Sequence, residues 1–573
     1  MAANDLLNEF SDFGVTPAPN ILEKCLDLMN KYGVSSETFV NCWLGYSTTK
    51  LQGEGPTLDT LVNFDKEVLS KEKSSKSIKK EPTEDSPVIH NITTINQIAE
   101  DDELLGGYGT PARKPSVGAK RSALEGTPQN KRLAGLGQTP GTVNKFSTRT
   151  NAGEVVVKYP TNNTDVITWS RSDETWKPNV RLYGAATLTS ESKYMFSRLR
   201  DKYEILEDQI DSFTKALAEK FSIEEFSRNN KVQSDTFHTI GRICCDATSG
   251  ARLNASSLLL EGSKEMSSGQ SVPLDVSHVK EYSFFPGQVV AVEGSNPTGK
   301  KIVVTAVSAP PIPPMVKSDI GLQGPLNVIV ACGPFTLIDD LEFTPLQELI
   351  EQINTILPHL VILMGPFLDA KNKKIESGEL DRTHQEEFDQ FLEKLQGAIF
   401  NSVQVVIVSS WRDVHHRTIY PTPPFSSKKK QPNFQFLPDP CILNVDGVLI
   451  ALTSTDILFH LSKEEIAVVP TGSDRMGRLV SHLFSQQSFY PLSPPSEEMS
   501  IDLELAEEHG KLPFTPHVLI TSSELRYFIK NVQGCVAVNT ERIVKGYSGG
   551  TYARMQIKKD GANIQVKAEV LRI

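Results

Sequence analysis

Three stretches in the second half of the chain decide its fold: NVIVACGPFT at 327–336, LVILMGPFLDA at 360–370 and VQVVIVSSWRDVHH at 403–416. Each opens with a run of Val, Ile and Leu and passes directly into a loop of small, polar or charged residues. Such apolar runs predict strands that are buried on both faces. In a layered α/β domain, the loops at these strand ends are where a catalytic site would be built.

The rest of this region continues the same alternation of strands and helices. We predict strands at Asn327–Ala331, Leu360–Met364, Val403–Val408 and Val518–Ile520, with helices at Pro345–Leu357 and His384–Phe400. The predicted α/β domain covers residues 316–573 and follows a proline-rich hinge at 309–314.

A second domain is expected over residues 154–315. The apolar spacing from Ser190 to Phe221 predicts a helix that covers a core. After it come short runs broken by glycine turns, which predict the strands of a small OB-type barrel. These runs are Phe237–Cys245, Ser256–Leu260, Phe284–Gly294 and Lys301–Val307.

An OB barrel raises the alternative of single-stranded DNA binding, which needs a basic groove and exposed aromatic side chains. Between residues 234 and 310 there are six basic and seven acidic side chains, and the aromatic residues are few. We therefore expect little or no direct nucleic acid binding, and protein docking is the favoured role.

The first part of the chain has a different pattern. Residues 1–70 predict a helical bundle for protein docking, with one helix from Pro19 to Tyr32. Residues 71–153 are rich in Lys, Ser, Thr, Pro and Gly, so we predict a disordered linker. The whole chain is a multidomain α+β protein.

The predicted linker carries a local excess of positive charge, with eight basic residues and one acidic residue between Leu104 and Thr150. Two basic pairs separated by nine residues have the form of a bipartite nuclear import signal. These pairs are Lys120-Arg121 and Lys131-Arg132. The expected location is the nucleus.

Proline-directed phosphorylation motifs lie in the same region. The candidate sites are Ser86, Thr110, Thr127 and Thr139, each followed directly by proline. A phosphate at Thr127 would add negative charge beside Lys131 and Arg132.

Composition excludes several classes of protein. No stretch reaches the ~18 apolar residues of a membrane span, so no membrane contact is expected. The seven cysteines are scattered and contain no CxxC pair, which argues against a zinc site. A net charge of -11 argues against a surface that grips nucleic acid throughout.

The loops at 331–336, 363–370 and 408–416 resemble those of calcineurin-like phosphoesterase domains in the form found in B subunits of replicative DNA polymerases. The order of bundle, basic linker, OB barrel and phosphoesterase-like domain is similar to the polymerase alpha B-subunit family along the whole chain. Active members of the superfamily hold two cations about 3.5 to 4 Å apart, using DxH, GDxxD, GNH[DE] and GHxH motifs.

On these motifs the chain departs at almost every ligand. Gly333 and Phe335 take the DxH positions, and Pro366 replaces the aspartate that bridges the metals, although Asp369 remains. In the third loop Trp411 and Arg412 stand where Asn and the catalytic His belong, leaving Asp413.

The other histidines do not restore the site. The late His pair aligns with Ser523 and Leu525, whereas His415 and His416 are adjacent and point to opposite sides of an extended segment. His460 and His517 lie near other predicted strand ends. We predict an inactive phosphoesterase domain with no catalytic residues, no metal and no cofactor.

The resemblance implies a non-catalytic scaffold subunit of DNA polymerase alpha–primase. It would bind the C-terminal domain of the catalytic subunit, reach the primase subunits through the complex, and meet other replication proteins through the N-terminal bundle. In that role it would support the start of DNA replication, when RNA–DNA primers are made. The alternatives are an active metal-dependent phosphoesterase or exonuclease, and a single-stranded DNA-binding OB protein.

Overall fold

The computed structural model describes the chain from residue 145 onward with short gaps, and parts of the chain before it. The described residues are 6, 19–32, 39, 40, 43, 56, 60, 61, 64, 88–90, 145–161, 167, 169, 176–184, 188–246, 252–427 and 431–573. The chain forms two compact units, Met1–Ser86 and Pro87–Ile573. The candidate sites Ser86, Thr110, Thr127 and Thr139 and the basic pairs Lys120-Arg121 and Lys131-Arg132 lie outside the described residues.

The larger unit contains a seven-stranded sheet in the order β13-β12-β11-β10-β22-β23-β2. The four strands from β10 to β13 run parallel, and the remaining pairings are antiparallel. Its strands are β2 (Val155–Tyr159), β10 (Leu326–Cys332), β11 (Leu360–Met364), β12 (Gln404–Val408), β13 (Phe434–Leu437), β22 (Thr551–Asp560) and β23 (Asn563–Arg572). The strands predicted at 327–331, 360–364 and 403–408 are confirmed.

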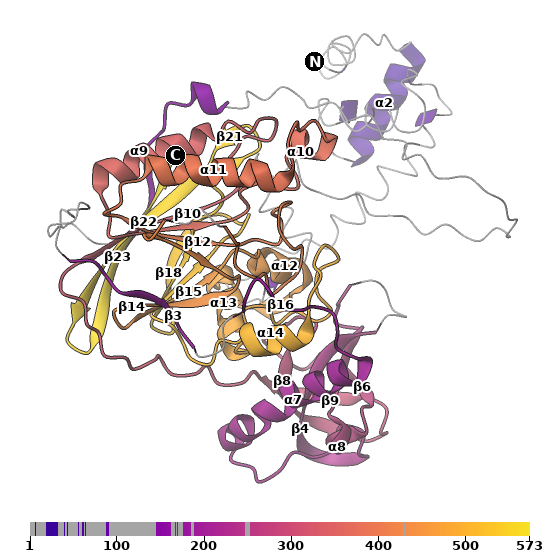
Figure 1. Cartoon of the computed structure of the whole chain (residues 1–573). Coiled ribbons are helices and arrows are strands. Elements are labelled where there is room, and N and C mark those ends of the chain that lie inside the picture. The colour runs from indigo at the N-terminus through magenta and orange to yellow at the C-terminus, as the bar shows by residue number, and fades with distance from the viewer. Residues whose placement is uncertain are drawn as a thin grey trace, which may run out of the picture. The chain divides into compact units, whose positions relative to one another are not determined.

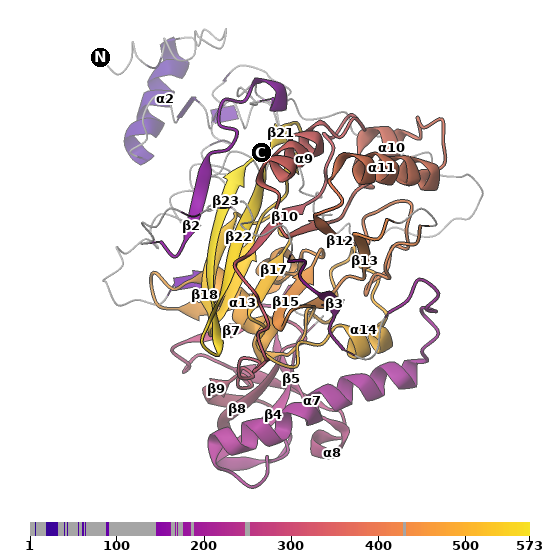
Figure 2. The ribbon, with the colours of Figure 1, turned by 60° about the vertical axis from the view of Figure 1, so that its left-hand side comes forward.

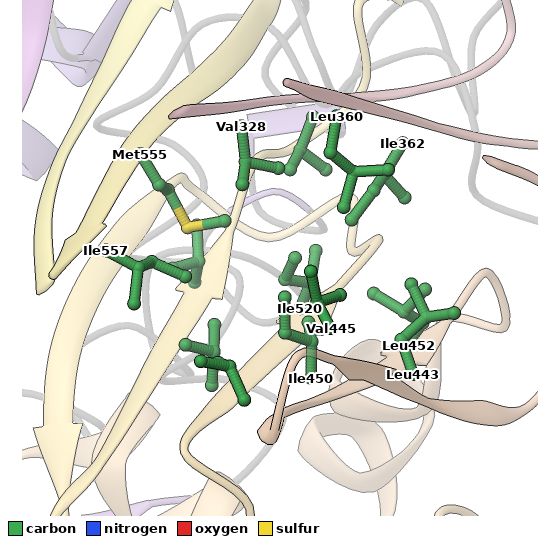
Figure 3. Close-up of a cluster of buried hydrophobic side chains, with 14 of the residues drawn as sticks. Val328, Leu360, Ile362, Leu443, Val445, Ile450, Leu452, Ile520, Met555 and Ile557 are labelled. Carbon is green, nitrogen blue, oxygen red and sulfur yellow. The ribbon is translucent and has the colours of Figure 1, made fainter. Parts of the chain in front are cut away.

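A six-stranded sheet packs against one face of the first, in the order β18-β19-β17-β15-β14-β3. Apolar side chains from both sheets meet between them and form one core (Figure 3). The strands are β3 (Val180–Leu182), β14 (Cys441–Val445), β15 (Val448–Thr453), β17 (Val518–Thr521), β18 (Phe528–Val532) and β19 (Cys535–Asn539). The strand predicted at 518–520 is therefore present as β17.

Helices cover both outer faces of this pair of sheets (Figure 1). α9 (Thr344–Ile356) and α11 (His384–Ala398) pack on the seven-stranded sheet, close to their predicted bounds. α12 (Ile457–Glu464) and α13 (Arg475–Ser485) pack on the six-stranded sheet. The result is a four-layer α/β domain, because each sheet buries one face on the other and one face under helices.

The middle of the chain forms a closed five-stranded barrel, with β4, β5, β6, β9 and β8 in order around it. Its strands are β4 (Gln233–Cys245), β5 (Leu258–Glu261), β6 (Ser271–Asp275), β8 (Val289–Asn296) and β9 (Ile302–Ser308). The predicted barrel is confirmed. β6 was not predicted, because the short segment SVPLD contains a proline and shows little strand pattern.

The helix beside the barrel, α7, spans Leu199–Phe221, so it begins nine residues later than the predicted start at Ser190. The reason is tertiary. The Met195 amide donates to Asp502 in the α/β domain at 2.6 Å, and Met195 has a φ of 60°. This contact holds the segment before the helix out of helical geometry.

The strands β2 and β3 belong to the sheets of the α/β domain, although both lie within the predicted barrel domain of residues 154–315. β2 pairs with β23 at the edge of one sheet, and β3 pairs with β14 at the edge of the other. Phe146, in the predicted linker, is buried in the core beneath α9. The strand partners of β2 and β3 lie hundreds of residues away in sequence, so no local pattern places these segments in the α/β domain.

A small three-stranded sheet spans the barrel and the α/β domain, in the order β1-β16-β7. β7 (Tyr282–Phe284) comes from the barrel's chain segment and β16 (Ile466–Val469) from the α/β domain. β1 (Val88–His90) pairs with the other edge of β16, so three residues of the predicted linker form a strand.

Polar contacts reinforce the junction between the barrel and the α/β domain. The Glu465 carboxylate is buried and accepts hydrogen bonds from Arg478 at 2.7 and 3.0 Å and from Ser283 of β7 at 2.6 Å. His482 Nε2 lies 3.1 Å from the same carboxylate. Gln486 bonds both the amide and the carbonyl of Val289 in β8. These side chains join the two domains across their interface.

The smaller unit contains helix α2 (Pro19–Tyr32), which confirms the helix predicted over that range. Cys25, Leu28 and Met29 face a cluster with Phe39, Trp43 and Phe64. Among the described residues, no helix is long and apolar enough to cross a membrane.

Candidate functional site

The loops that follow β10, β11 and β12 lie side by side. The Gly333 amide donates to the Met364 carbonyl at 2.8 Å, and the Gly365 amide donates to the Val408 carbonyl at 3.0 Å. A further backbone bridge joins Asp369 to Asp413. Parallel strands bring their carboxyl ends to one edge of the sheet, so the three sequence motifs meet as the resemblance implies.

The two residues that were assigned to the DxH motif, Gly333 and Phe335, are closely packed. Phe335 is fully buried and stacks on Phe367 with ring centroids 5.0 Å apart. A Cβ atom at Gly333 would lie 2.0 Å from the Pro366 carbonyl oxygen. An aspartate at 333 would therefore require the backbone to move. At position 335 the side chain is an aromatic ring that points into the core, whereas a metal ligand would have to face the solvent.

The carboxylate of Asp369 is bound by an arginine. Arg412 Nε donates to Asp369 Oδ1 at 3.1 Å, and its Nη2 donates to Asp369 Oδ2. Arg412 Nη1 also donates to Glu524 Oε1 at 3.4 Å. Arg412 and Asp369 are both buried, so a fixed guanidinium supplies the positive charge beside this carboxylate.

Asp413 holds the second loop in place through its backbone. Its Oδ1 accepts hydrogen bonds from the amides of Phe367 at 2.6 Å and Leu368 at 2.8 Å. Burial raises the pKa of Asp413 to about 8, the carboxyl of Asp369 adds to the effect, and the two amide bonds oppose it. Burial therefore favours the protonated form of this carboxyl.

The space at these loops is small. A cavity of about 10 Å³ lies beside Asp369, lined also by Pro334, Thr336, Lys371 and Asn372. That volume accommodates about one water molecule. Within the described part of the chain, no three His, Cys, Asp or Glu side chains converge in a way that could hold a metal ion.

A second buried arginine, Arg542, lies at the base of the loops. Its Nη1 donates to the Gly333 carbonyl at 3.2 Å and to the Ser522 hydroxyl. Asp456 caps α12 and accepts the Glu524 amide at 2.7 Å. Sequence reasoning missed Arg542, Glu524 and Asp456, because none belongs to a motif and each comes from a distant segment.

The histidines have structural partners. The His415 ring stacks on Phe388 with centroids 3.8 Å apart, and burial lowers its pKa to about 3. His416 contacts the Pro423 carbonyl at 2.8 Å, and His460 contacts Tyr490 and Glu498 at 2.9 and 3.1 Å. His517 Nδ1 accepts the Leu449 amide at 3.0 Å.

The remaining motif positions are also engaged in packing or backbone contacts. Trp411 packs against the core beneath α12 and α13. The Ser523 amide donates to Asn539 at 3.0 Å, and the Leu525 amide donates to the Ser523 hydroxyl at 3.2 Å.

The barrel offers few aromatic side chains to a nucleic acid. Phe237, Phe284 and Phe285 are buried, and Tyr282 stacks on Phe284. Lys301 is paired with Asp275 at 2.8 Å, and Arg242 is buried with its Nη2 donating to the Leu206 carbonyl at 2.7 Å.

We expect Asp413→Asn to flatten the pH dependence of stability. Folding raises the pKa of this carboxyl from the ordinary aspartate value near 4 to about 8. The free energy of unfolding therefore falls as the pH rises between these two values. The amide keeps an oxygen for Phe367 and Leu368 but cannot ionise. Between pH 6 and pH 9 the wild type should lose on the order of 1 to 3 kcal/mol more than the variant.

Thermal denaturation of the full chain at both pH values measures this difference. The exposed Asp381→Asn is the matched control and should follow the wild type. If wild type and Asp413→Asn had the same dependence of stability on pH, ionisation of Asp413 would not lower the free energy of unfolding.

Comparisons with known proteins match nearly the whole chain. Three family models match: the N-terminal family of the DNA polymerase alpha B subunit at residues 4–71, the OB domain of the DNA polymerase alpha B subunit at 203–309, and the DNA polymerase alpha/epsilon B-subunit family at 328–530. The second of these covers the five-stranded barrel and α7 from Tyr203 onward.

Relatives that are named as B subunits of DNA polymerase alpha extend this match. The protein of Rattus norvegicus is 35% identical over 609 residues, covering 100% of both chains. That of Drosophila melanogaster is 32% identical over 96% of both chains, and that of Saccharomyces cerevisiae is 30% identical over 66% of this chain and 63% of its own. The chain belongs to the family of DNA polymerase alpha B subunits, and is thus an accessory subunit of a replicative polymerase.

Proposed function

We propose that this chain is a non-catalytic scaffold in a DNA polymerase alpha–primase complex. Its barrel and its inactive phosphoesterase-like domain would together bind the C-terminal domain of the catalytic subunit. Primase would be reached through that complex, which would start replication by making RNA–DNA primers. The names of the full-length relatives support this partner.

The observation that carries the non-catalytic role is the pairing of Arg412 with Asp369. One of the few carboxylates left at a ligand position has both oxygens bonded to a guanidinium. A divalent ion entering here would have to displace that guanidinium and would meet fixed positive charge. The junction through Glu465 and Gln486 supports a scaffold, because it holds two domains in one arrangement.

The purified chain should show no turnover with manganese on single-stranded DNA or on a chromogenic phosphodiester. It should also keep the same thermal midpoint in the presence of a chelator, because no ion contributes to the fold. Turnover that disappears in an Asp369→Ala, Asp413→Ala variant would establish a phosphoesterase and overturn the scaffold role. Turnover that persists in that variant would come from a contaminant.

The segment before residue 145 is proposed as an import and docking region. The basic pairs Lys120-Arg121 and Lys131-Arg132 would act as one nuclear import signal, with phosphorylation at Ser86, Thr110, Thr127 or Thr139 adding charge nearby. Replacing all four basic residues with alanine should move a tagged chain, expressed without its partners, to the cytoplasm. A variant that stays nuclear under those conditions would rule out the signal. The N-terminal unit would dock other replication proteins.

A further inference from the structure

The helices on the outer face of the seven-stranded sheet carry an excess of negative charge. Figure 2 shows α9, α10 (Lys373–Ser377) and α11 together on this face. The Asn354 side chain of α9 donates to the Ala398 carbonyl of α11 at 2.8 Å. Residues 339–394, here called the acidic layer, contain 13 acidic and five basic side chains. All of these acidic side chains except Asp369 are at least partly exposed.

Many carboxylates of the acidic layer face solvent without a positive partner. Arg382 is paired with Glu387 at 3.4 Å, whereas Lys371 pairs with Glu498 outside the layer at 3.8 Å. Six exposed carboxylates have no ion-pair partner among the residues that the structure describes. They are Asp339, Glu342, Glu351, Glu376, Glu379 and Asp381. A face with this surplus of negative charge attracts a cationic ligand.

Residues 145–149 lie on the acidic layer. The short helix η2 (Phe146–Thr148) places the Phe146 ring in the core beneath α9. Arg149 follows, and its Nη2 donates to the Glu348 carboxylate of α9 while its Nη1 donates to the Phe146 carbonyl at 2.6 Å. The guanidinium also lies 3.6 Å from the centroid of the Phe146 ring. The chain that leads into Lys145 is therefore fixed to the acidic layer at its C-terminal end.

That part of the chain has the opposite charge. Between Leu104 and Thr150 there are eight basic side chains and one acidic side chain. Lys131 lies 14 residues before Lys145, and Lys120 lies 25 residues before it. Flexible chains of these lengths span roughly 20 to 30 Å. Since α9 and α11 are each about 20 Å long, both basic pairs are tethered within reach of the acidic layer at high effective concentration.

We propose that the acidic layer is an intramolecular docking surface for residues 113–145, here called the basic segment. Lysine and arginine side chains of the segment would pair with the six exposed carboxylates and so extend the contact that Arg149 makes with Glu348. An acidic partner of the basic segment would then have to compete with the chain's own surface. The docking depends neither on the catalytic subunit nor on the proposed import role.

Carbodiimide cross-linking of the full-length chain tests where the basic segment lies, because this reagent joins an amine to a carboxylate that it contacts. The sample is an equal mixture of unlabelled and nitrogen-15-labelled chains, digested and analysed by mass spectrometry. Lys114, Lys120 and Lys131 should couple to the acidic layer within one chain. Cross-links between labelled and unlabelled chains would assign the surface to a second copy and overturn the proposal, as would coupling of these lysines only to carboxylates outside the layer.

Limited proteolysis tests whether the charge of the acidic layer holds the segment. The variant carries four substitutions at exposed positions, Glu342→Gln, Glu351→Gln, Glu379→Gln and Asp381→Asn. At about 0.05 M salt, trypsin should cleave the basic segment roughly four- to tenfold faster in this variant, because each exposed ion pair contributes modestly and four are removed. Raising the salt to about 0.5 M should bring the wild type to the variant's rate, because salt screens exposed charges.

The matched control removes the same number and kind of carboxylates from exposed positions in the barrel domain. Its substitutions are Glu224→Gln, Glu225→Gln, Asp235→Asn and Glu281→Gln. The control should be cleaved at the wild-type rate, and both variants should keep the wild-type thermal midpoint. Equal cleavage rates for the wild type and both variants at low salt would overturn the proposal, as would equal acceleration in both variants.

Discussion

Arg412→Ala should lower the stability of the α/β domain by about 3 to 5 kcal/mol, because it leaves the Asp369 carboxylate buried without its counter-charge. For a domain of this size that loss corresponds to a fall in the thermal midpoint of roughly 6 to 15 °C. Glu524 would lose its contact with Arg412 as well. Thermal denaturation of the full chain, followed by circular dichroism, measures the change.

Two further variants separate charge from geometry at this position. Arg412→Lys keeps the charge but cannot bond both carboxylate oxygens in the same way, so it should recover part of the loss. The control is Arg382→Ala, which removes an exposed pair with Glu387 at 3.4 Å and should change stability by no more than about 0.5 kcal/mol. A midpoint for Arg412→Ala equal to that of the control would show that the pair with Asp369 contributes nothing.

Glu465→Ala should have an effect of similar size, at the junction between the domains. Burial alone would raise the pKa of Glu465, but hydrogen bonds from His482 and Arg478 outweigh it and hold the pKa below its ordinary value. Removing the carboxylate leaves Arg478 without its counter-charge and removes the hydrogen bond that Ser283 donates across the junction. We expect a loss of about 3 to 5 kcal/mol and faster hydrogen exchange in β7 and β16.

The sign of the pH effect follows from the lowered pKa. The contribution of Glu465 is present above the ordinary glutamate value near 4.3 and is lost as pH falls toward the folded-state pKa. Glu465→Gln keeps an acceptor for Ser283, so it should lose less stability than Glu465→Ala. Its stability should also depend less on pH in the acid range. Glu204→Ala, which removes an exposed pair on α7, is the control. Unchanged exchange in β7 and β16 of Glu465→Ala would mean that Glu465 does not couple the domains.

Local pattern was enough to predict the strands and helices of the α/β core. Leu360–Met364 reads as a strand because every residue is apolar, and it is β11 with those bounds, buried on both faces. The helix at Pro19–Tyr32 is equally clear from its spacing. The loss of ligand side chains at Gly333, Phe335 and Pro366 is also visible in the sequence, because glycine, phenylalanine and proline offer no side-chain lone pair to a metal.

The start of α7 and the boundary of the barrel domain could not be predicted in this way. The segment before Leu199 is held by Asp502, and β2 pairs with β23, some four hundred residues further along the chain. No local pattern contains those partners. In sequence, the apolar spacing of α7 indicates a helix that covers a core along its whole length, since spacing alone does not show where the barrel ends.

The partners of the charged side chains at the strand ends were decided by the tertiary structure alone. The amino-acid sequence determined that Gly333, Phe335 and Pro366 offer no ligand side chain and that Asp369, Arg412 and Asp413 follow the strands. It could not say that Arg412 bonds Asp369 and Glu524, or that Glu465 joins Arg478 to Ser283 in the barrel. Secondary structure follows from side-chain patterns within a few residues, whereas buried charges are stabilised by partners that only the folded chain brings within hydrogen-bonding distance.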